Sequence, residues 1–391
     1  MIDITGSSDA LGPTPMTVEG PARDEPFLLR GRRLRADGTE SGGLHVAASG
    51  DVMLMGGCAS TAPPAGQVRL NPGLVTRSWS DGATQRTWTA LELPLLVWEY
   101  AGPQSATLTW RTPVAAGATI DRSGDGDFSV SHETGKRVRF IALGGALAAE
   151  PVGRAVEFRL QHSSSARLVA VAADDDADER RTIDRLARRG IAGLATQRTQ
   201  HAAHLAALGP RLRTPEPAID RAFGWAALLW GEAAAWTGAP SQVPFAAPAP
   251  GALERLREAA ALLESRSIEL LGPDPGRAAS VLVDGVHGLF GVRPDAAHDA
   301  LELAPALPDV WPSMALDRFR IGSAVLDVEV RRRPSATVVA LRIRSGGPLS
   351  VAIGLPDVAV MQVDLDDVVM PAARARFEAR HEHKLVFRHA E

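Results

Sequence analysis

The sequence of 391 residues contains one cysteine, Cys58, and one tyrosine, Tyr100. A single cysteine excludes a disulfide framework and a cysteine-based zinc site within one chain. Cys58 follows an apolar run in the stretch MGGCAS, and we interpret it as a buried or turn residue rather than a nucleophile. The motifs GxGxxG, GxxxxGKS/T, HExxH and GxSxG do not occur in their required contexts. We therefore expect no cofactor.

Long apolar runs and basic stretches are also lacking. No apolar run approaches the roughly 20 residues that span a bilayer, so we expect no membrane association. The formal net charge is −4, whereas nucleic-acid-binding proteins usually carry a basic stripe. Residues 1–15 contain neither a basic segment nor an apolar one after it. We therefore expect no signal peptide and a cytoplasmic protein.

The residues that are present, 45% of them hydrophobic, change their periodicity along the chain. Residues 1–25 are rich in Gly, Pro, Ser and Asp and are expected to be poorly ordered. Apolar residues alternate with polar ones over 26–175, which predicts a large antiparallel β-sandwich. Residues 176–213 predict a helical linker. The acids at 174–179 favour the start of this helix over a metal site, because acids stabilise a helix N-terminus.

The segment 214–292 predicts three helices. The first has Thr214 as its cap and is apolar around its whole circumference, which is typical of a buried helix. A Pro-rich linker separates it from an amphipathic helix at 253–270, and a last helix runs over 277–290. Gly291 fits the left-handed position that ends such a helix.

Two stretches of the sequence carry a resemblance to a known family. The turn GLFGVRPD at 288–295 precedes a strand of the pattern L-x-L-x-P-x-L-P-x-x-W, and alternation over 293–391 then predicts a small C-terminal β-sandwich. The pattern residues are Leu301, Leu303, Pro305, Leu307, Pro308 and Trp311. This order resembles the end of the helical barrel and the start of the C-terminal sandwich in six-hairpin glycosidases. These are the (α/α)6-barrel glycoside hydrolases and phosphorylases, including trehalase-like, glycogen-debranching-like and rhamnosidase-like enzymes. The stretch 211–230 resembles the beginning of their barrel.

The resemblance implies a glycosidase from which most of the catalytic barrel is missing. Twelve barrel helices need about 200 residues, whereas 214–292 supplies material for three. The expected fold is mainly β with a helical segment. It consists of a large N-terminal β-supersandwich, a helical linker, a truncated α/α segment of about three helices and a small C-terminal β-sandwich.

The missing helices bear directly on catalysis. Glycosidases place two carboxylates about 5–10 Å apart across the scissile bond. No such pair is identifiable in 214–292. Glu232, within an apolar helix that also holds Trp225 and Trp230, is the one candidate. We therefore expect a non-catalytic, carbohydrate-related protein that binds a glycan or a partner protein. The alternative is a glycoside hydrolase whose site is completed by oligomerisation or by a second chain.

A glycan-binding surface is predicted at residues 77–90. Trp79 and Trp88 flank a polar loop with Asp81 and Arg86, and indole faces pack well against the C–H faces of sugar rings. These residues are the best candidate for a sugar platform, but we favour the alternative that both tryptophans are core residues beside a turn.

A weak calcium-loop candidate lies in 121–133. Asp121, Ser123, Asp125 and Asp127 occupy positions 1, 3, 5 and 7, and a glycine occupies position 6. Position 12 is His132 in place of the glutamate that binds the ion through both oxygens. We therefore favour a β-hairpin turn and predict no metal site.

The shortened barrel also predicts partners. Apolar helix residues such as Trp225, Leu229 and Trp236 would lose their usual neighbours, and exposed apolar patches mark interaction sites. We expect a homo-oligomer or a hetero-complex formed through 216–290, with an oligosaccharide as the small-molecule ligand.

Overall fold

The structure is a computed structural model of the chain. It describes residues 18–23, 26–31, 34–39, 44–48, 53–60, 65–71, 73–103, 106–113, 118–123, 127–152, 155–237, 250–267, 275–356, 359–370 and 374–389. The predicted disordered segment 1–25 lies mostly outside these residues. The chain divides into two compact units, of which the first comprises 1–203 with 266–273 and the second 204–265 with 274–391.

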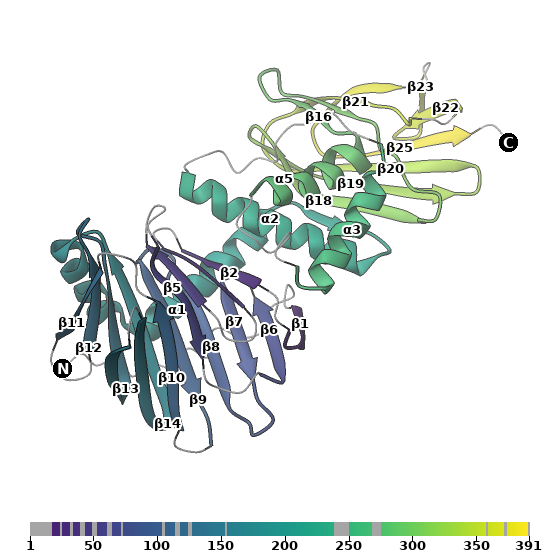
Figure 1. Cartoon of the computed structure of the whole chain (residues 1–391). Helices are drawn as coiled ribbons and strands as arrows, with labels where there is room; N and C mark the ends of the chain where they lie inside the picture. Colours follow the sequence, from purple (N-terminus) through teal and green to yellow (C-terminus); the bar gives the residue numbers. More distant parts are fainter. Residues whose placement is uncertain are drawn as a thin grey trace. The chain divides into compact units, whose positions relative to one another are not determined.

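The first unit is built on antiparallel strands, as the alternating pattern predicts. One path of paired strands runs β1-β6-β7-β8-β9-β14-β10-β5-β4-β3-β2, and β13, β12 and β11 extend from β14 (Figure 1). The strands are β1 (Val18–Pro21), β2 (Pro26–Arg30), β3 (Leu34–Thr39), β4 (Leu44–Ala48), β5 (Met53–Ser60), β6 (Gln67–Asn71), β7 (Leu74–Ser78), β8 (Thr84–Thr89), β9 (Leu95–Ala101), β10 (Ala106–Pro113), β11 (Ala118–Ser123), β12 (Asp127–His132), β13 (Arg137–Val152) and β14 (Ala155–Ala173).

The long hairpin β13–β14 joins the two halves of this unit. Residues 155–162 of β14 pair with β10, whereas residues 165–171 pair with β9. The register of β13 shifts between Leu143 and Gly145, and Gly144 has a φ of 78°. A Cβ on Gly145 would lie 2.5 Å from the carbonyl oxygen of Gln161. Two adjacent glycines therefore allow the irregularity in the hairpin.

The helix α1 (Asp176–Leu208) begins at the predicted acids, where the backbone N–H of Asp178 donates to Asp175 Oδ1 at 2.7 Å. The sequence therefore predicted a helix start here correctly. Within the first unit, α1 packs Leu186, Ile191 and Leu194 against a core of β-strand residues. The helix is kinked at Gly190, whose φ of 66° is non-helical.

The second unit contains the remaining helices and two sheets. Its helices are α2 (Pro217–Thr237), α3 (Ala252–Glu264), α5 (Pro275–Val283) and the π-helical turn η1 (Asp284–Leu289). The sheets have the orders β15-β18-β19-β20-β25-β22-β23 and β16-β17-β21-β24. Their strands are β15 (Arg211–Arg213), β16 (Arg293–Asp295), β17 (Ala300–Leu303), β18 (Ser313–Ile321), β19 (Ala324–Arg333), β20 (Ala336–Ser345), β21 (Leu349–Ile353), β22 (Val360–Leu365), β23 (Val368–Met370), β24 (Ala375–Ala379) and β25 (Glu382–His389). The mainly β fold with a helical segment is thus confirmed.

The helix α2 is buried on most sides, as its apolar circumference predicts. Its side chains Ile219, Phe223 and Trp225 are each at most 4% exposed. The predicted cap differs, because α2 starts at Pro217 and Thr214 lies before it. The Asp220 carboxylate reaches back and accepts hydrogen bonds from the Thr214 N–H and hydroxyl, each at 2.9 Å.

The predicted helix over 277–290 ends in a π-helical turn rather than a regular α-helix. Two glycines in this turn face neighbouring helices closely, since a Cβ on Gly285 would meet the Phe223 ring at 2.5 Å and one on Gly288 would meet Ala252 at 2.4 Å. Gly291 then ends the helix, as predicted. Its φ is 55°, and its N–H donates to the His287 carbonyl at 3.1 Å.

The two stretches that carry the family resemblance meet within the second unit. Glu216, just before α2, accepts a hydrogen bond from Trp311 Nε1 at 2.8 Å. The same carboxylate accepts two bonds from Arg257 on α3, at 2.6 and 3.0 Å. One buried indole and one arginine thereby connect the start of α2, α3 and the chain that leads into β18.

Candidate functional site

The predicted glycan platform in the first unit is only partly accessible. Trp88 on β8 is 0% exposed and packs among residues of β7, β9, β14 and α1. Its Nε1 donates to Glu99 Oε2 at 3.3 Å. Because neither face of this ring meets solvent, the position of Trp88 departs from the platform prediction and agrees with the core alternative.

The other platform residues surround a tight turn. Trp79 is partly exposed and lies 6.3 Å from the ring of Tyr100. Asp81 is exposed and accepts a hydrogen bond from the backbone N–H of Ala83 at 2.9 Å, which stabilises the turn. Arg86 lies on β8 and is partly exposed. A sugar contact at Trp79, with Asp81 and Arg86 beside it, stays a prediction.

Glu232, the catalytic candidate, lies on α2 and is 3% exposed. Trp225 on the same helix is 4% exposed, and the side chain of Trp236 lies outside the described residues. The burial expected for Glu232 is therefore present. A catalytic role for it stays a prediction.

The calcium-loop candidates lie on the hairpin β11–β12, where Ser123 is paired with Asp127. Asp121 is exposed on β11, and Asp125 lies outside the described residues. The Asp127 carboxylate accepts a hydrogen bond from Arg139 at 2.8 Å, which occupies one of its oxygens. Within the part of the chain that the structure describes, no group of three or more His, Cys, Asp or Glu could hold a metal ion.

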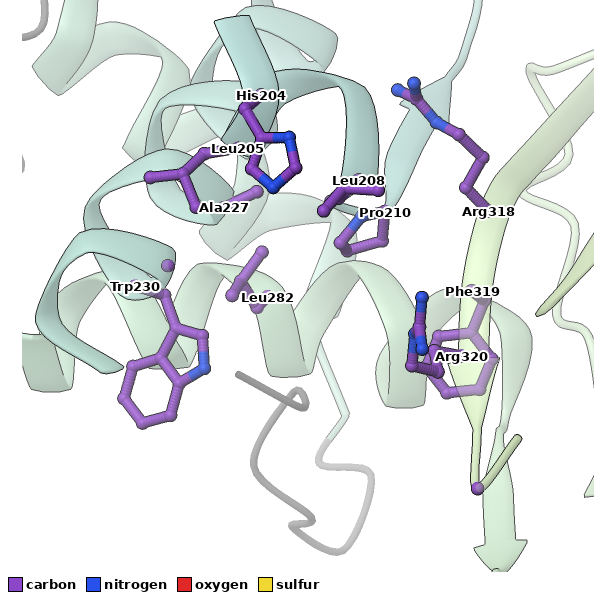
Figure 2. A pocket seen from close by; sticks show the side chains of 13 residues that line it. His204, Leu205, Leu208, Pro210, Ala227, Trp230, Leu282, Arg318, Phe319 and Arg320 are labelled. Atoms are coloured by element: carbon purple, nitrogen blue, oxygen red, sulfur yellow. The ribbon is translucent and has the colours of Figure 1, made fainter. Parts of the chain in front are cut away.

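A cavity that was not predicted from the sequence lies in the second unit. It has a volume of about 470 Å³, within the range of small-molecule sites. The end of α1, the helices α2 and α5 and the hairpin β18–β19 surround it (Figure 2). Its apolar lining includes Leu208, Trp230, Leu282 and Phe319.

Three basic or titratable side chains line the same cavity, namely His204, Arg318 and Arg320. In Figure 2, Trp230 lies on one side of the view and Arg320 on the other, with His204 above them. Among the described residues, neither the His204 ring nor the Arg320 guanidinium has a hydrogen-bond or ion-pair partner. No aspartate or glutamate is among the described lining residues. The cavity therefore combines an aromatic surface with unused hydrogen-bond donors and positive charge.

A β-bulge turns Arg318 toward this cavity. The pairing of β18 with β19 shifts between Leu316 and Phe319, and Arg318 has a left-handed φ of 58°. This backbone costs on the order of 1 kcal/mol at a residue with a Cβ. In a regular strand Arg318 would share the buried face of Leu316. The bulge keeps Phe319 buried at 4% exposure and leaves Arg318 outside the core.

Two hydrogen bonds hold the bulge. The backbone N–H of Arg318 donates to Asp327 Oδ1 at 2.8 Å, and its guanidinium donates to the Ala207 carbonyl at 2.7 Å. That carbonyl belongs to the last turn of α1, whose final C=O groups lack partners within the helix. Asp327 is also paired with Arg344 at 2.6 Å. The Asp327 carboxylate that accepts from the Arg318 backbone is thus shared with a second arginine.

Three acids of the helical segment form ion pairs with arginines of neighbouring helical elements. Asp284 pairs with Arg255 at 2.6 Å, Glu258 with Arg277 at 3.1 Å and Glu264 with Arg221 at 3.1 Å. Hydrogen bonds from Arg257 lower the pKa of Glu216, against a smaller opposing effect of burial. Burial raises the pKa of Asp220, although hydrogen bonds from Thr214 oppose it.

The apolar surface expected over 216–290 is largely covered. Trp225 is buried, and Leu229 is only partly exposed. The large hydrophobic side chains that are exposed in the described structure all lie outside this range. They are Val152, Leu208, Val310, Met361, Val368 and Val369. Assembly through 216–290 stays a prediction, but the reason given for it does not hold at Trp225.

Sequence reasoning missed most of the cavity. Of its residues, Trp230 was named only as a neighbour of Glu232. His204, Arg318 and Arg320 were not predicted as site residues. One signal was available in the stretch SMALDRFRI, where a regular alternation would place an arginine on the apolar face of the strand. That conflict indicates a bulge, and bulges often lie beside functional sites.

Comparisons with known proteins give structural likenesses only. No family model and no curated protein matches the chain. Among solved structures, it is similar to a bacterial glucoamylase complexed with acarbose, at 6% identity and a TM-score of 0.37, over 54% of this chain and 42% of that one. It is similar to a family GH92 α-mannosidase from Bacteroides thetaiotaomicron, at 7% identity and a TM-score of 0.37, over 54% and 39%.

A third similar structure is a heparinase III, at 12% identity and a TM-score of 0.26, over 41% of this chain and 37% of that one. The chain thus spans less than half the length of each of these proteins. From likenesses of this size we draw no conclusion about family or activity. Separately, none of the described helices has the length and apolar character to cross a membrane.

Proposed function

We propose that this chain is a non-catalytic carbohydrate-binding protein with the layout of a six-hairpin glycosidase that has lost most of its barrel. The saccharide binds in the cavity of the second unit, against Trp230. One observation carries the proposal, namely that the described lining of this cavity combines an indole with basic side chains and contains no carboxylate.

The absence of acids from the described lining separates binding from hydrolysis. Hydrolysis of a glycosidic bond needs a proton donor and a second carboxylate on the other side of the bond. The acids Glu258, Glu264 and Asp284 of the helical segment are each held in an ion pair with an arginine. Binding needs only what the cavity offers, an aromatic face for the sugar ring and donors for its oxygen atoms.

A titration with a saccharide panel tests the proposal. Isothermal calorimetry should detect binding of at least one mono- or disaccharide, and chromatography of the same mixture should recover the sugar intact. Trp230→Ala should weaken this binding at least 10-fold. If no member of the panel binds, or if binding survives Trp230→Ala unchanged, the proposal is wrong.

The alternative, a glycoside hydrolase completed by oligomerisation or a second chain, is favoured by one observation, the burial of the Glu232 carboxylate in α2. It predicts turnover of aryl glycosides or disaccharides, lost in Glu232→Gln. Light scattering tests the associated assembly, since a monomer at micromolar concentration contradicts a homo-oligomer formed through 216–290.

A further inference from the structure

The positive charge of the cavity indicates which class of saccharide it binds. The described lining has two arginines, a histidine and no acid, so its positive charge is not balanced from within. Arg320 is exposed and has no partner among the described residues. Arginine offers planar paired donors that match the two oxygen atoms of a carboxylate or the oxygens of a sulfate.

The backbone around these arginines supports a role in recognition. The bulge at Asp317–Arg318 changes the register of β18, after which Phe319 is buried and Arg320 is exposed at the cavity. Without it, Arg320 would occupy the opposite face of the strand and lie on the core side. The strained left-handed residue therefore fixes where the free guanidinium lies, and strained backbone of this kind concentrates at binding sites.

The aromatic side of the cavity restricts the ligand. A bare anion would contact Arg320 and His204 but not the Trp230 indole or the exposed Leu208, which also line the cavity. A sugar ring that carries an anionic group would contact both the basic side chains and the apolar surface. The cavity volume of about 470 Å³ admits one or two sugar rings, since drug-sized ligands occupy cavities of this order.

Resting on the proposed function, we infer that the ligand is an acidic saccharide whose carboxylate or sulfate group pairs with Arg320. His204 donates a further hydrogen bond to it, and the sugar ring packs against Trp230. Arg318, held by Ala207 and Asp327, adds positive charge and fixes the bulge.

Calorimetry with matched probes tests this inference. The probes are a disaccharide with a terminal glucuronate, the same disaccharide with a terminal 6-sulfated glucose, its neutral counterpart with glucose, and inorganic sulfate. We expect at least one of the two acidic disaccharides to bind 10-fold or more tightly than the neutral one. The acid that binds distinguishes the carboxylate from the sulfate.

Arg320→Gln removes the charge that pairs with the anionic group and should reduce that preference to less than 3-fold. Because the side chain is exposed, this substitution causes no loss of packing. Arg333→Gln removes one charge from an exposed position at the end of β19, away from the cavity lining, and should leave the preference unchanged. Circular dichroism checks that both variants are folded.

Three outcomes overturn the inference. Equal affinity for acidic and neutral disaccharides would show that no anionic group pairs with Arg320, but the proposed function would still stand. An equal loss of preference in Arg320→Gln and Arg333→Gln reduces the effect to long-range charge. Binding of inorganic sulfate as tightly as the acidic disaccharides means that the sugar contributes nothing, and this contradicts the proposed function as well.

Discussion

Two tryptophans, Trp88 in the first unit and Trp230 in the second, have different surroundings in the structure. Trp88 belongs to a buried cluster with residues of β7, β9, β14 and α1 and donates its N–H to a buried glutamate. Trp230 is partly exposed at a cavity. The difference teaches that the elements packed around a side chain decide whether it belongs to the core or to a binding surface.

The largest expected effect concerns the core tryptophan. Trp88→Ala should lower the free energy of unfolding by about 3–5 kcal/mol, because it leaves a large cavity in this buried cluster. Chemical denaturation measures this. Trp88→Phe keeps most of the apolar volume and should lose clearly less unfolding free energy than Trp88→Ala. A loss below about 1 kcal/mol for Trp88→Ala would mean that the ring is not enclosed.

The second effect concerns the turn that ends the helical segment. Gly291→Ala should cost about 2–4 kcal/mol of unfolding free energy, from left-handed backbone together with overpacking. Its Cβ would lie 2.4 Å from the Ala304 carbonyl oxygen. Gly347→Ala, where a Cβ meets nothing within 4 Å, is the matched control and should change stability by less than about 0.5 kcal/mol. Equal melting curves for the two variants would contradict the prediction.

The third effect completes the comparison of the two indoles. Trp230→Ala should cost less than half of the stability lost in Trp88→Ala, since its ring is already partly exposed. It should nevertheless weaken saccharide binding at least 10-fold. The two variants thus separate stability from binding. If Trp230→Ala were the more destabilising of the two, Trp230 would be a core residue and the comparison would fail.

The smallest effect is a change in acid sensitivity. The pKa of Glu216 is lowered from its ordinary value of 4.5, chiefly by the Arg257 hydrogen bonds. Below pH 4.5 the unfolded chain therefore binds the proton more readily than the folded one, and stability falls as pH falls through the folded pKa. Glu216→Gln should lower stability by about 1 kcal/mol at pH 7, since solvent screens a partly exposed pair.

The same variant should flatten the decline in stability below pH 4.5. Melting temperatures of the unmodified protein and of Glu216→Gln between pH 3 and 7 measure this decline. A decline equally steep in Glu216→Gln would show that the Glu216–Arg257 pair does not contribute to it.

Much of the architecture could be predicted because it follows from local patterns. Alternation predicts the strands, the acids before Asp178 predict the start of α1, and Gly291 predicts the end of the helical segment. Each of these features depends on neighbours along the chain, and short-range steric and hydrogen-bonding rules govern it.

The cavity could not be predicted in the same way, because its parts lie far apart in the sequence. His204 lies near the end of one helix, Trp230 lies on another, and Arg320 belongs to a strand about 90 residues further on. The burial of Trp88, by contrast, agrees with the core alternative that the sequence favoured. In the π-helical turn at 284–289, two glycines lie close to Phe223 and Ala252, which are again distant in sequence.

Hydrogen–deuterium exchange with and without bound saccharide tests the central claim most directly. The acidic disaccharides and their neutral counterpart serve as ligands, and peptides covering 77–90 report on the first unit. The account predicts that the saccharide slows exchange at 204–210, 227–231 and 318–322 and leaves 77–90 unchanged. Protection confined to 77–90 would place the ligand at Trp79, and that result would contradict a binding site at Trp230.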